Sequence, residues 1–191
     1  MLKTIGYIFL ASIVSMNLMG ATTAAAADLP LPAVGAAGKA HHVARCGAIV
    51  FLRLGGTELH TTNLTLRNFD PVHSVTITRL VISNALGVTI YDSTISGLPA
   101  FQNTILGPTN DTLGPRQSST LQLDDFLAFQ DPTTRPLQLL VAWSSAPLAS
   151  PLRVGTTRVV RGRNAATGAV LEERARSGGE CETSRWPQFL K

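Results

Sequence analysis

The sequence predicts an all-β fold, an immunoglobulin-like antiparallel β-sandwich of about eight short strands. Short segments rich in threonine, valine and isoleucine alternate apolar with polar residues, which is the pattern of a strand with one buried face. Clusters of glycine, proline, asparagine and aspartate separate these segments. Helical patterns of about 10–15 residues do not alternate with them, which argues against an α/β fold.

Four of the predicted strands lie in the first half of the chain. The first, GAIVFLRL, is a nearly continuous apolar run that ends at a Gly-Gly pair. The second alternates, with Leu64 and Leu66 on one face, and the turn residues Asp70 and Pro71 follow it. The four ranges are 47–54, 58–68, 75–83 and 88–93.

The third predicted strand, VTITRLVIS, changes the parity of its apolar positions. Val75 and Ile77 share one parity, whereas Leu80 and Ile82 share the other, and a regular strand cannot turn both pairs inward. A β-bulge near residues 78–79, or a strand that crosses between sheets, would reconcile the two pairs. A strand that is buried on both faces would need neither, so the pattern leaves these alternatives open.

The second half contains a long connection and four more predicted strands. Residues 97–116 are rich in glycine and proline, and we expect a loop that crosses between the sheets, packed down by Leu98, Phe101, Ile105 and Leu106. The strands are expected at 119–126, 136–143, 157–163 and 169–175. The last two form a hairpin around AATG, in which Gly168 supplies a positive φ. In 136–143 the expected core set is Leu137, Leu139, Val141 and Trp143.

The amino-terminal residues have the pattern of a cleaved secretory signal peptide. Lys3 precedes an apolar run and then a small-residue tract ending at Ala27, and the run is shorter than a membrane span. We therefore expect a signal peptide at 1–27, a flexible leader at 28–43, a sandwich domain at 44–182 and a short tail at 183–191. The mature chain is expected to be periplasmic or secreted and to contain no transmembrane segment.

The chain contains two cysteines, Cys46 and Cys181. An oxidising compartment favours disulfides, and the first and last strands of a sandwich often lie near each other. We expect an intramolecular Cys46–Cys181 disulfide that holds the carboxyl-terminal segment to the first strand.

The positive charge of the mature chain is concentrated near its end. Residues 28–150 contain seven Lys and Arg against eight Asp and Glu, whereas residues 151–191 contain eight against four. Either the arginines meet an anionic surface from the outer face of the hairpin, or they only solvate it. The candidates are Arg158, Arg161, Arg163, Arg174 and Arg176. Nucleic acid is not expected as a partner, because aromatic residues for base stacking are scarce.

The sequence contains no catalytic or cofactor-binding motif, and we expect neither enzymatic activity nor a cofactor. It has no nucleophile elbow, no HExxH helix and no glycine-rich phosphate loop, and the acidic pair Asp124 and Asp125 should face opposite ways on a strand. The metal-site candidates are His60, His73 and Asp70, which could approach each other if 58–68 and 73–83 paired as a hairpin.

The segments NLTLRNFDPVHSVTITRLVISNALG, PRQSSTLQL and LQLLVAWSS, followed by the closing hairpin, resemble an uncharacterised family of small exported bacterial β-sandwich domains. The resemblance covers about residues 45–178 and implies fold and compartment, with no catalytic residues to transfer. The leading expectation is an exported non-catalytic binding or structural module whose partner is an unknown protein, glycan or anionic surface. A periplasmic metal-handling protein using His60 and His73 is the alternative, and an enzyme with a loop-built site is the second.

Overall fold

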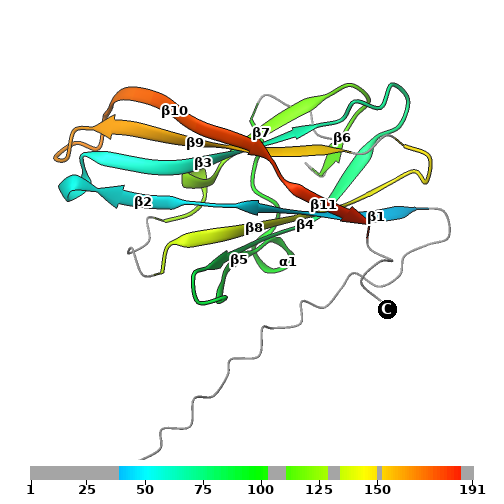
Figure 1. The fold of residues 1–191 in the computed structure, drawn as a ribbon, viewed down its shortest axis with the longest axis horizontal. Helices are drawn as coiled ribbons and strands as arrows, with labels where there is room; N and C mark the ends of the chain where they lie inside the picture. The colour runs from blue at the N-terminus through cyan, green and yellow to red at the C-terminus, as the bar shows by residue number, and fades with distance from the viewer. Residues whose placement is uncertain (1–38, 103–110, 129–133, 150–151, 186–191) are drawn as a thin grey trace, which may run out of the picture. The chain divides into compact units, whose positions relative to one another are not determined.

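The computed structural model describes residues 39–102, 111–128, 134–149 and 152–185. Figure 1 shows two antiparallel β-sheets packed face to face, which confirms the predicted all-β sandwich. Within the described residues, no helix is both long and apolar enough to cross a membrane.

One sheet, here sheet A, has six strands, and the other, sheet B, has five. Sheet A runs in the order β11 (Glu182–Arg185), β1 (Ala40–Gly47), β8 (Pro136–Ser145), β4 (Val75–Asn84) and β5 (Thr89–Asp92), with β6 (Thr112–Leu113) also paired to β4. Sheet B runs in the order β10 (Val170–Glu180), β9 (Arg153–Arg163), β3 (Glu58–Arg67) and β2 (Val50–Arg53), with β7 (Ser118–Gln122) also paired to β3. Short helical turns are α1 (Ser93–Ser96), η1 (Leu54–Gly56) and η2 (Leu123–Asp125).

The parity change in β4 results from a bulge. Ile77 pairs with Trp143 and Arg79 pairs with Ala142, so Thr78 is an extra residue on the β4 side. Because one added residue reverses the facing of all that follow, Leu80 and Ile82 enter the same core as Val75 and Ile77. Of the three alternatives that the pattern left open, the bulge is the correct one.

The core face of β8 agrees with the predicted set at three of four positions. Leu139, Val141 and Trp143 are almost completely buried in the core. Leu137 is 37% exposed, so its assignment to the core was wrong. It lies near the start of β8, where its carbonyl accepts a hydrogen bond from Ala48 N (3.1 Å) and its side chain borders a hollow.

The first predicted strand, 47–54, corresponds to β2, and β1 is an additional strand in the other sheet that the sequence analysis did not predict. β1 belongs to sheet A and begins at Ala40, within the range expected to be a leader. After Gly47 the chain crosses over, and Ile49 N donates to Thr62 Oγ1 (2.9 Å) before β2 joins sheet B. At the other end of the chain, β11 continues to Arg185, into the predicted tail.

The predicted crossing loop at 97–116 is partly described. Phe101 is buried in the core and Leu98 packs against it, whereas the other two expected anchors, Ile105 and Leu106, lie outside the described residues. The described part also contains β6, which adds a short pairing to β4 in sheet A. The predicted strand 119–126 ends earlier, because η2 follows β7 at Leu123.

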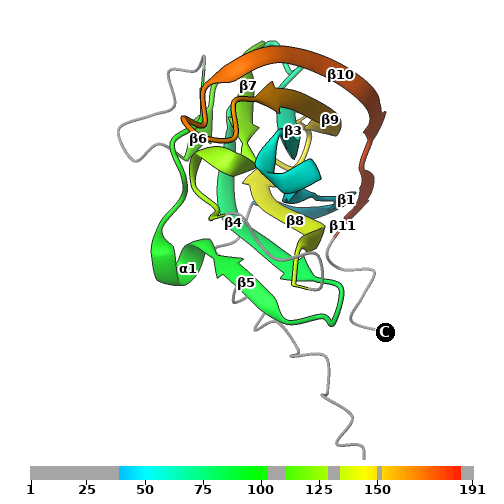
Figure 2. The ribbon, with the colours of Figure 1, turned by 90° about the vertical axis from the view of Figure 1, so that its left-hand side faces the viewer.

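The last predicted hairpin is confirmed. β9 and β10 pair antiparallel, and Gly168 in the connection has a φ of +72°. β10 is the edge strand of sheet B and is exposed along its whole length. Figure 2 shows β10 following this edge and continuing into β11, which pairs with β1 in sheet A.

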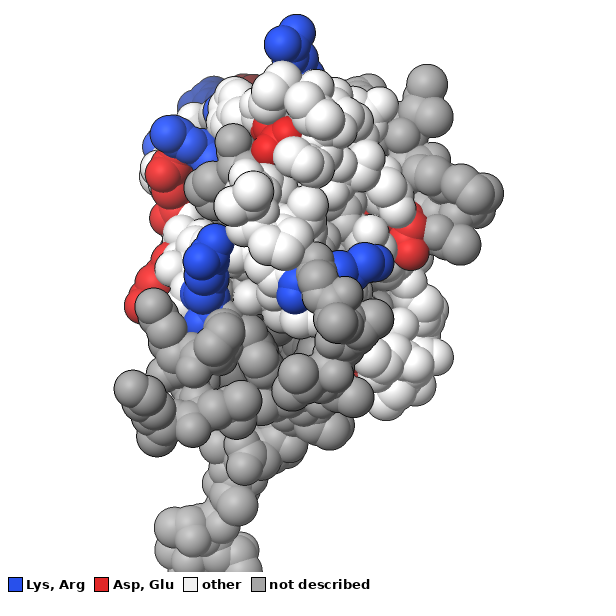
Figure 3. Space-filling model, turned by 90° about the vertical axis from the view of Figure 1, so that its right-hand side faces the viewer, with Lys and Arg blue, Asp and Glu red and all other residues white. Residues whose placement is uncertain are grey.

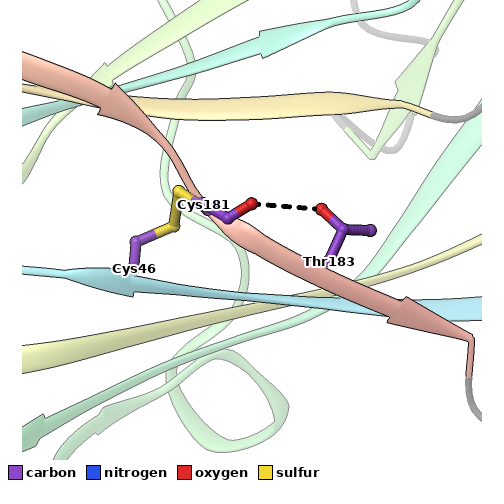
Figure 4. The surroundings of a disulfide bond; sticks show 3 residues. All are labelled: Cys46, Cys181 and Thr183. Atoms are coloured by element: carbon purple, nitrogen blue, oxygen red, sulfur yellow. Dashed lines mark hydrogen bonds between the residues drawn. A yellow bond between two sulfur atoms is a disulfide. The ribbon is translucent and has the colours of Figure 1, made fainter.

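The predicted disulfide between Cys46 and Cys181 is present, with the two Cα atoms 4.8 Å apart. Cys181 lies between β10 and β11, where the last part of the chain passes from sheet B to sheet A, and Cys46 lies near the end of β1 (Figure 4). The Cys181 backbone is held on both sides: its N–H donates to Val154 O (2.8 Å), and its carbonyl accepts from Thr183 Oγ1 (3.4 Å).

Candidate functional site

A polar region begins where the inner face of sheet B leaves the apolar core. In the register of β3 and β9, His60 lies opposite Val160 and Thr62 lies opposite Arg158. These positions share the parity of Leu64, a core residue, and opposed residues in antiparallel strands share a face. His60 and Arg158 therefore continue the inner face of the sheet toward the end with the η1 and β9–β10 turns.

A hollow of about 500 Å³ lies over this region, and we call it the basic groove. Its lining residues are Arg53, Leu54, Glu58, His60, Arg158, Val160 and Arg176. A second hollow of about 330 Å³ lies beside it, next to the crossover between β1 and β2, and Arg158 borders both. Three arginines therefore surround a groove that has a single carboxylate in its lining.

A chain of hydrogen bonds fixes the orientation of His60. Arg158 Nη2 donates to His60 Nδ1 (2.8 Å), and because arginine has no acceptor, Nδ1 must be the unprotonated ring nitrogen. His60 Nε2 then donates to Glu58 Oε2 (3.1 Å). The ring is also stacked on Phe51, with centroids 4.8 Å apart, and the Arg135 guanidinium carbon lies 5.1 Å from the Phe51 centroid.

The groove arginines, of which Arg158 is half-buried and the others are exposed, differ in their pairing from the two buried arginines. Arg79 forms an ion pair with Asp92, and Arg161 forms ion pairs with Asp124 and Glu173. In contrast, the groove arginines form no ion pair with any residue in the described part of the chain; these are Arg53, Arg158 and Arg176. The basic groove thus gathers three such arginines around a lining with one carboxylate, that of Glu58.

Arg158 is the half-buried member of this set. Its partner among the described residues is the neutral ring of His60, and its Nε is buried without a hydrogen-bond partner. A half-buried guanidinium without a carboxylate is unfavourable by itself, because desolvation of the charge is not offset by an ion pair. An anionic group in the groove would supply the missing attraction.

The five arginines predicted to form one anionic-surface site are divided between two faces of the hairpin. Arg161 and Arg163 have the opposite parity to Arg158 on β9 and therefore lie on the other face of the strand. Arg161 is already paired with Asp124 and Glu173. Arg174 faces inward but pairs with Glu172 (2.7 Å). Arg158 and Arg176 line the groove, so the five candidate arginines do not share one outer face of the hairpin.

The structure does not bring the metal-site candidates together. β3 and β4 lie in different sheets, so the hairpin that would have joined His60 to His73 does not exist. His60 lies near the start of β3, and His73 lies beyond its end, where Nδ1 is 3.1 Å from Asp70 Oδ1. No group of three or more potential metal ligands occurs among the residues that the structure describes.

Two features of the groove were not expected from the sequence. Leu54 follows β2 with a φ of +49°, a conformation that is rare for leucine, and is 66% exposed. Arg53 enters the groove because it follows Phe51 at strand spacing. The alternation of side chains along a strand also predicts that Arg158 and Arg161 lie on opposite faces of β9, because they are three residues apart. The sequence could therefore have separated these two arginines.

The opposite end of the sandwich has a different surface. In Figure 3, which faces that end, the basic side chains are separated by uncharged surface and several lie beside acidic ones. An example of this pairing at the start of β9 is Arg153, which contacts Glu180 (2.9 Å).

No protein-family model matches the chain, and no curated protein matches it. Among solved structures, the chain is similar to one described as the crystal structure of Thermotoga maritima 1070, with 14% sequence identity and a TM-score of 0.39. The similarity covers 78% of this chain and 95% of that chain. The resemblance to the exported sandwich family stays a prediction.

Proposed function

We propose that this protein is an exported, non-catalytic binding module whose basic groove holds an oxyanion group of its partner. The observation that carries the proposal is the uncompensated charge of Arg53, Arg158 and Arg176 around one hollow. Elsewhere the fold pairs its buried arginines with carboxylates, as at Arg79 and Arg161.

The chemistry of arginine selects the class of ligand. A guanidinium presents planar, parallel N–H donors that match carboxylate, phosphate and sulfate oxygens. A hollow of about 500 Å³ is within the usual range of ligand sites and has room for one such group with its neighbouring atoms. Leu54 and Val160 supply apolar walls that would exclude water from the bound group.

The arrangement of the groove supports binding rather than catalysis. His60 is the natural candidate for proton transfer, but Arg158 and Glu58 occupy both of its ring nitrogens. Among the described residues, the lining contains no serine, threonine or cysteine that His60 could activate as a nucleophile. The histidine therefore acts as a fixed support for Arg158.

The proposal of export rests on two features. The first 27 residues have the charge and apolar pattern of a signal peptide. The disulfide between Cys46 and Cys181 fits an oxidising compartment such as the periplasm or the cell exterior.

Immobilised heparin tests the groove as a soluble polyanion site. We expect retention of the mature protein at low salt, and elution of Arg176→Gln and Arg158→Gln at clearly lower salt. Arg174→Gln is the matched control, because it removes the same charge from the same strand at an already paired position. Equal shifts for Arg174→Gln and Arg176→Gln would reduce the effect to net charge and refute the groove. Arg176 is exposed, so its substitution leaves the fold intact.

A further inference from the structure

Two turns of sheet B lie at the same end of the molecule as the basic groove. The connection between β2 and β3 contains Leu54, and the connection between β9 and β10 leads into Val170 and Leu171 (Figures 1 and 2). Arg163 N donates to Thr57 O (2.8 Å), which ties the two turns together. We call this end of sheet B, residues 53–57 and 163–171, the tip.

The tip is apolar and basic, without acidic residues. Leu54 is 66% exposed, Val170 55% and Leu171 71%, and the residues around them are mostly alanine, glycine and threonine. Its charged residues are Arg53 and Arg163. Carboxylates begin only outside it, at residues 58 and 172.

The exposed apolar side chains reach across the sheet. β2 and β10 are three strand positions apart, so Leu54 and Leu171 are separated by about 14 Å across the sheet. The groove has Leu54 at its wall and Arg158 and Arg176 behind it. A single bound anion would contact the groove alone, whereas an extended anionic surface with an apolar layer beneath would contact both turns and the arginines at once.

The backbone of Leu54 supports a functional role for its side chain. Its φ of +49° lies in the left-handed region, where glycine or asparagine is more stable than leucine. Leu54 is exposed, so packing does not explain why leucine occupies a strained position. Strain of this kind occurs where a residue serves a binding site.

We propose that the tip of sheet B docks on an anionic phospholipid surface, with Leu54, Val170 and Leu171 entering the headgroup region. The arginines of the tip and groove contact lipid phosphates. This inference rests on the proposed function of the basic groove and names the source of its oxyanion. Apolar residues flanked by basic ones bind an anionic bilayer by partial insertion together with charge attraction.

Vesicle co-sedimentation of the mature protein tests the inference. The vesicles are pure phosphatidylcholine, or phosphatidylcholine with added phosphatidylglycerol. We expect binding to the anionic vesicles, and a loss of about tenfold or more in partitioning for the double variant Val170→Thr, Leu171→Thr, whose two residues do not line the basic groove. Leu148→Asn is the control, since Leu148 is 92% exposed in the connection between β8 and β9, away from the tip. It should bind like the wild type.

The heparin column separates failure of this inference from failure of the proposed function. The double variant retains the groove arginines, so its elution from heparin should remain that of the wild type. Retention on heparin without vesicle binding would identify a soluble polyanion as partner and overturn lipid docking alone. Vesicle binding that the double variant preserves would also overturn it, because charge without insertion would then suffice. Failure of both assays would overturn both proposals.

Discussion

Removal of the Cys46–Cys181 disulfide should destabilise the sandwich substantially. The bridge closes a segment of 135 residues, and the chain-entropy relation assigns about 5 kcal/mol to a loop of that length. That is a large fraction of the unfolding free energy of a typical single domain. The structure also indicates where the loss should begin. β11 has four residues, is mostly exposed and pairs only with β1, so the bridge is its main attachment.

Guanidinium unfolding of the oxidised protein and of the double variant Cys46→Ala, Cys181→Ala measures the difference. We expect a fall of about 3–5 kcal/mol in unfolding free energy, since strain and residual structure in the unfolded chain reduce the ideal value. Hydrogen exchange should show faster exchange in β11 than in β9. A reductant should act on the wild type and leave the double variant unchanged. Equal unfolding free energies for the two proteins would refute the reasoning.

Three further predictions concern single side chains. Val141→Asp places a charge in a fully buried site and should lower the free energy of unfolding by about 3–5 kcal/mol, as measured by chemical denaturation. Leu137→Asp, on the same strand but at a site that is 37% exposed, should lower it by under about 1 kcal/mol. Similar losses for the two variants would contradict the assignment of which β8 side chains face the core. Hydrogen bonding from Arg79 lowers the pKa of Asp92 from 3.8 to about 2, against the effect of burial. Because the unfolded chain takes up this proton first as the pH falls, about 2 kcal/mol of stability should be lost between pH 4 and pH 2 in the wild type, but not in Asp92→Asn; parallel pH profiles would exclude this linkage. Leu54→Asn should raise the unfolding free energy by about 1 kcal/mol by relieving a left-handed leucine, and a lower thermal midpoint would show that the leucine packs usefully.

Local patterns in the sequence predicted the strands well. Alternation identified β3, β4, β8 and the last hairpin, because one buried face imposes a period of two. The disulfide followed from having two cysteines and an export pattern. Even the bulge was visible as a change of parity, since apolar residues must enter one core.

The assignment of strands to sheets was beyond local patterns. Strands 58–68 and 75–83 look like hairpin neighbours, but β3 and β4 belong to different sheets, and this separates His60 from His73. The basic groove has the same origin in part. Local patterns predicted the hairpin of β9 and β10 that carries Arg158 and Arg176, but only the sheet order brings Arg53 of β2 to the same groove. The strain at Leu54 is a property of the backbone that no residue pattern reports.

The exposed edge strand β10 has a consequence for how the molecule behaves when concentrated. A free edge offers unpaired backbone groups to the strand of another molecule, and exposed Val170 and Leu171 would favour such growth. The pairing of β10 with β9 is irregular at two places, between Val170 and Glu172 and between Ala175 and Ser177. Charged residues lie between these two irregularities. An incoming strand would meet a bent and charged template, so the hairpin can present its apolar tip without seeding fibrils.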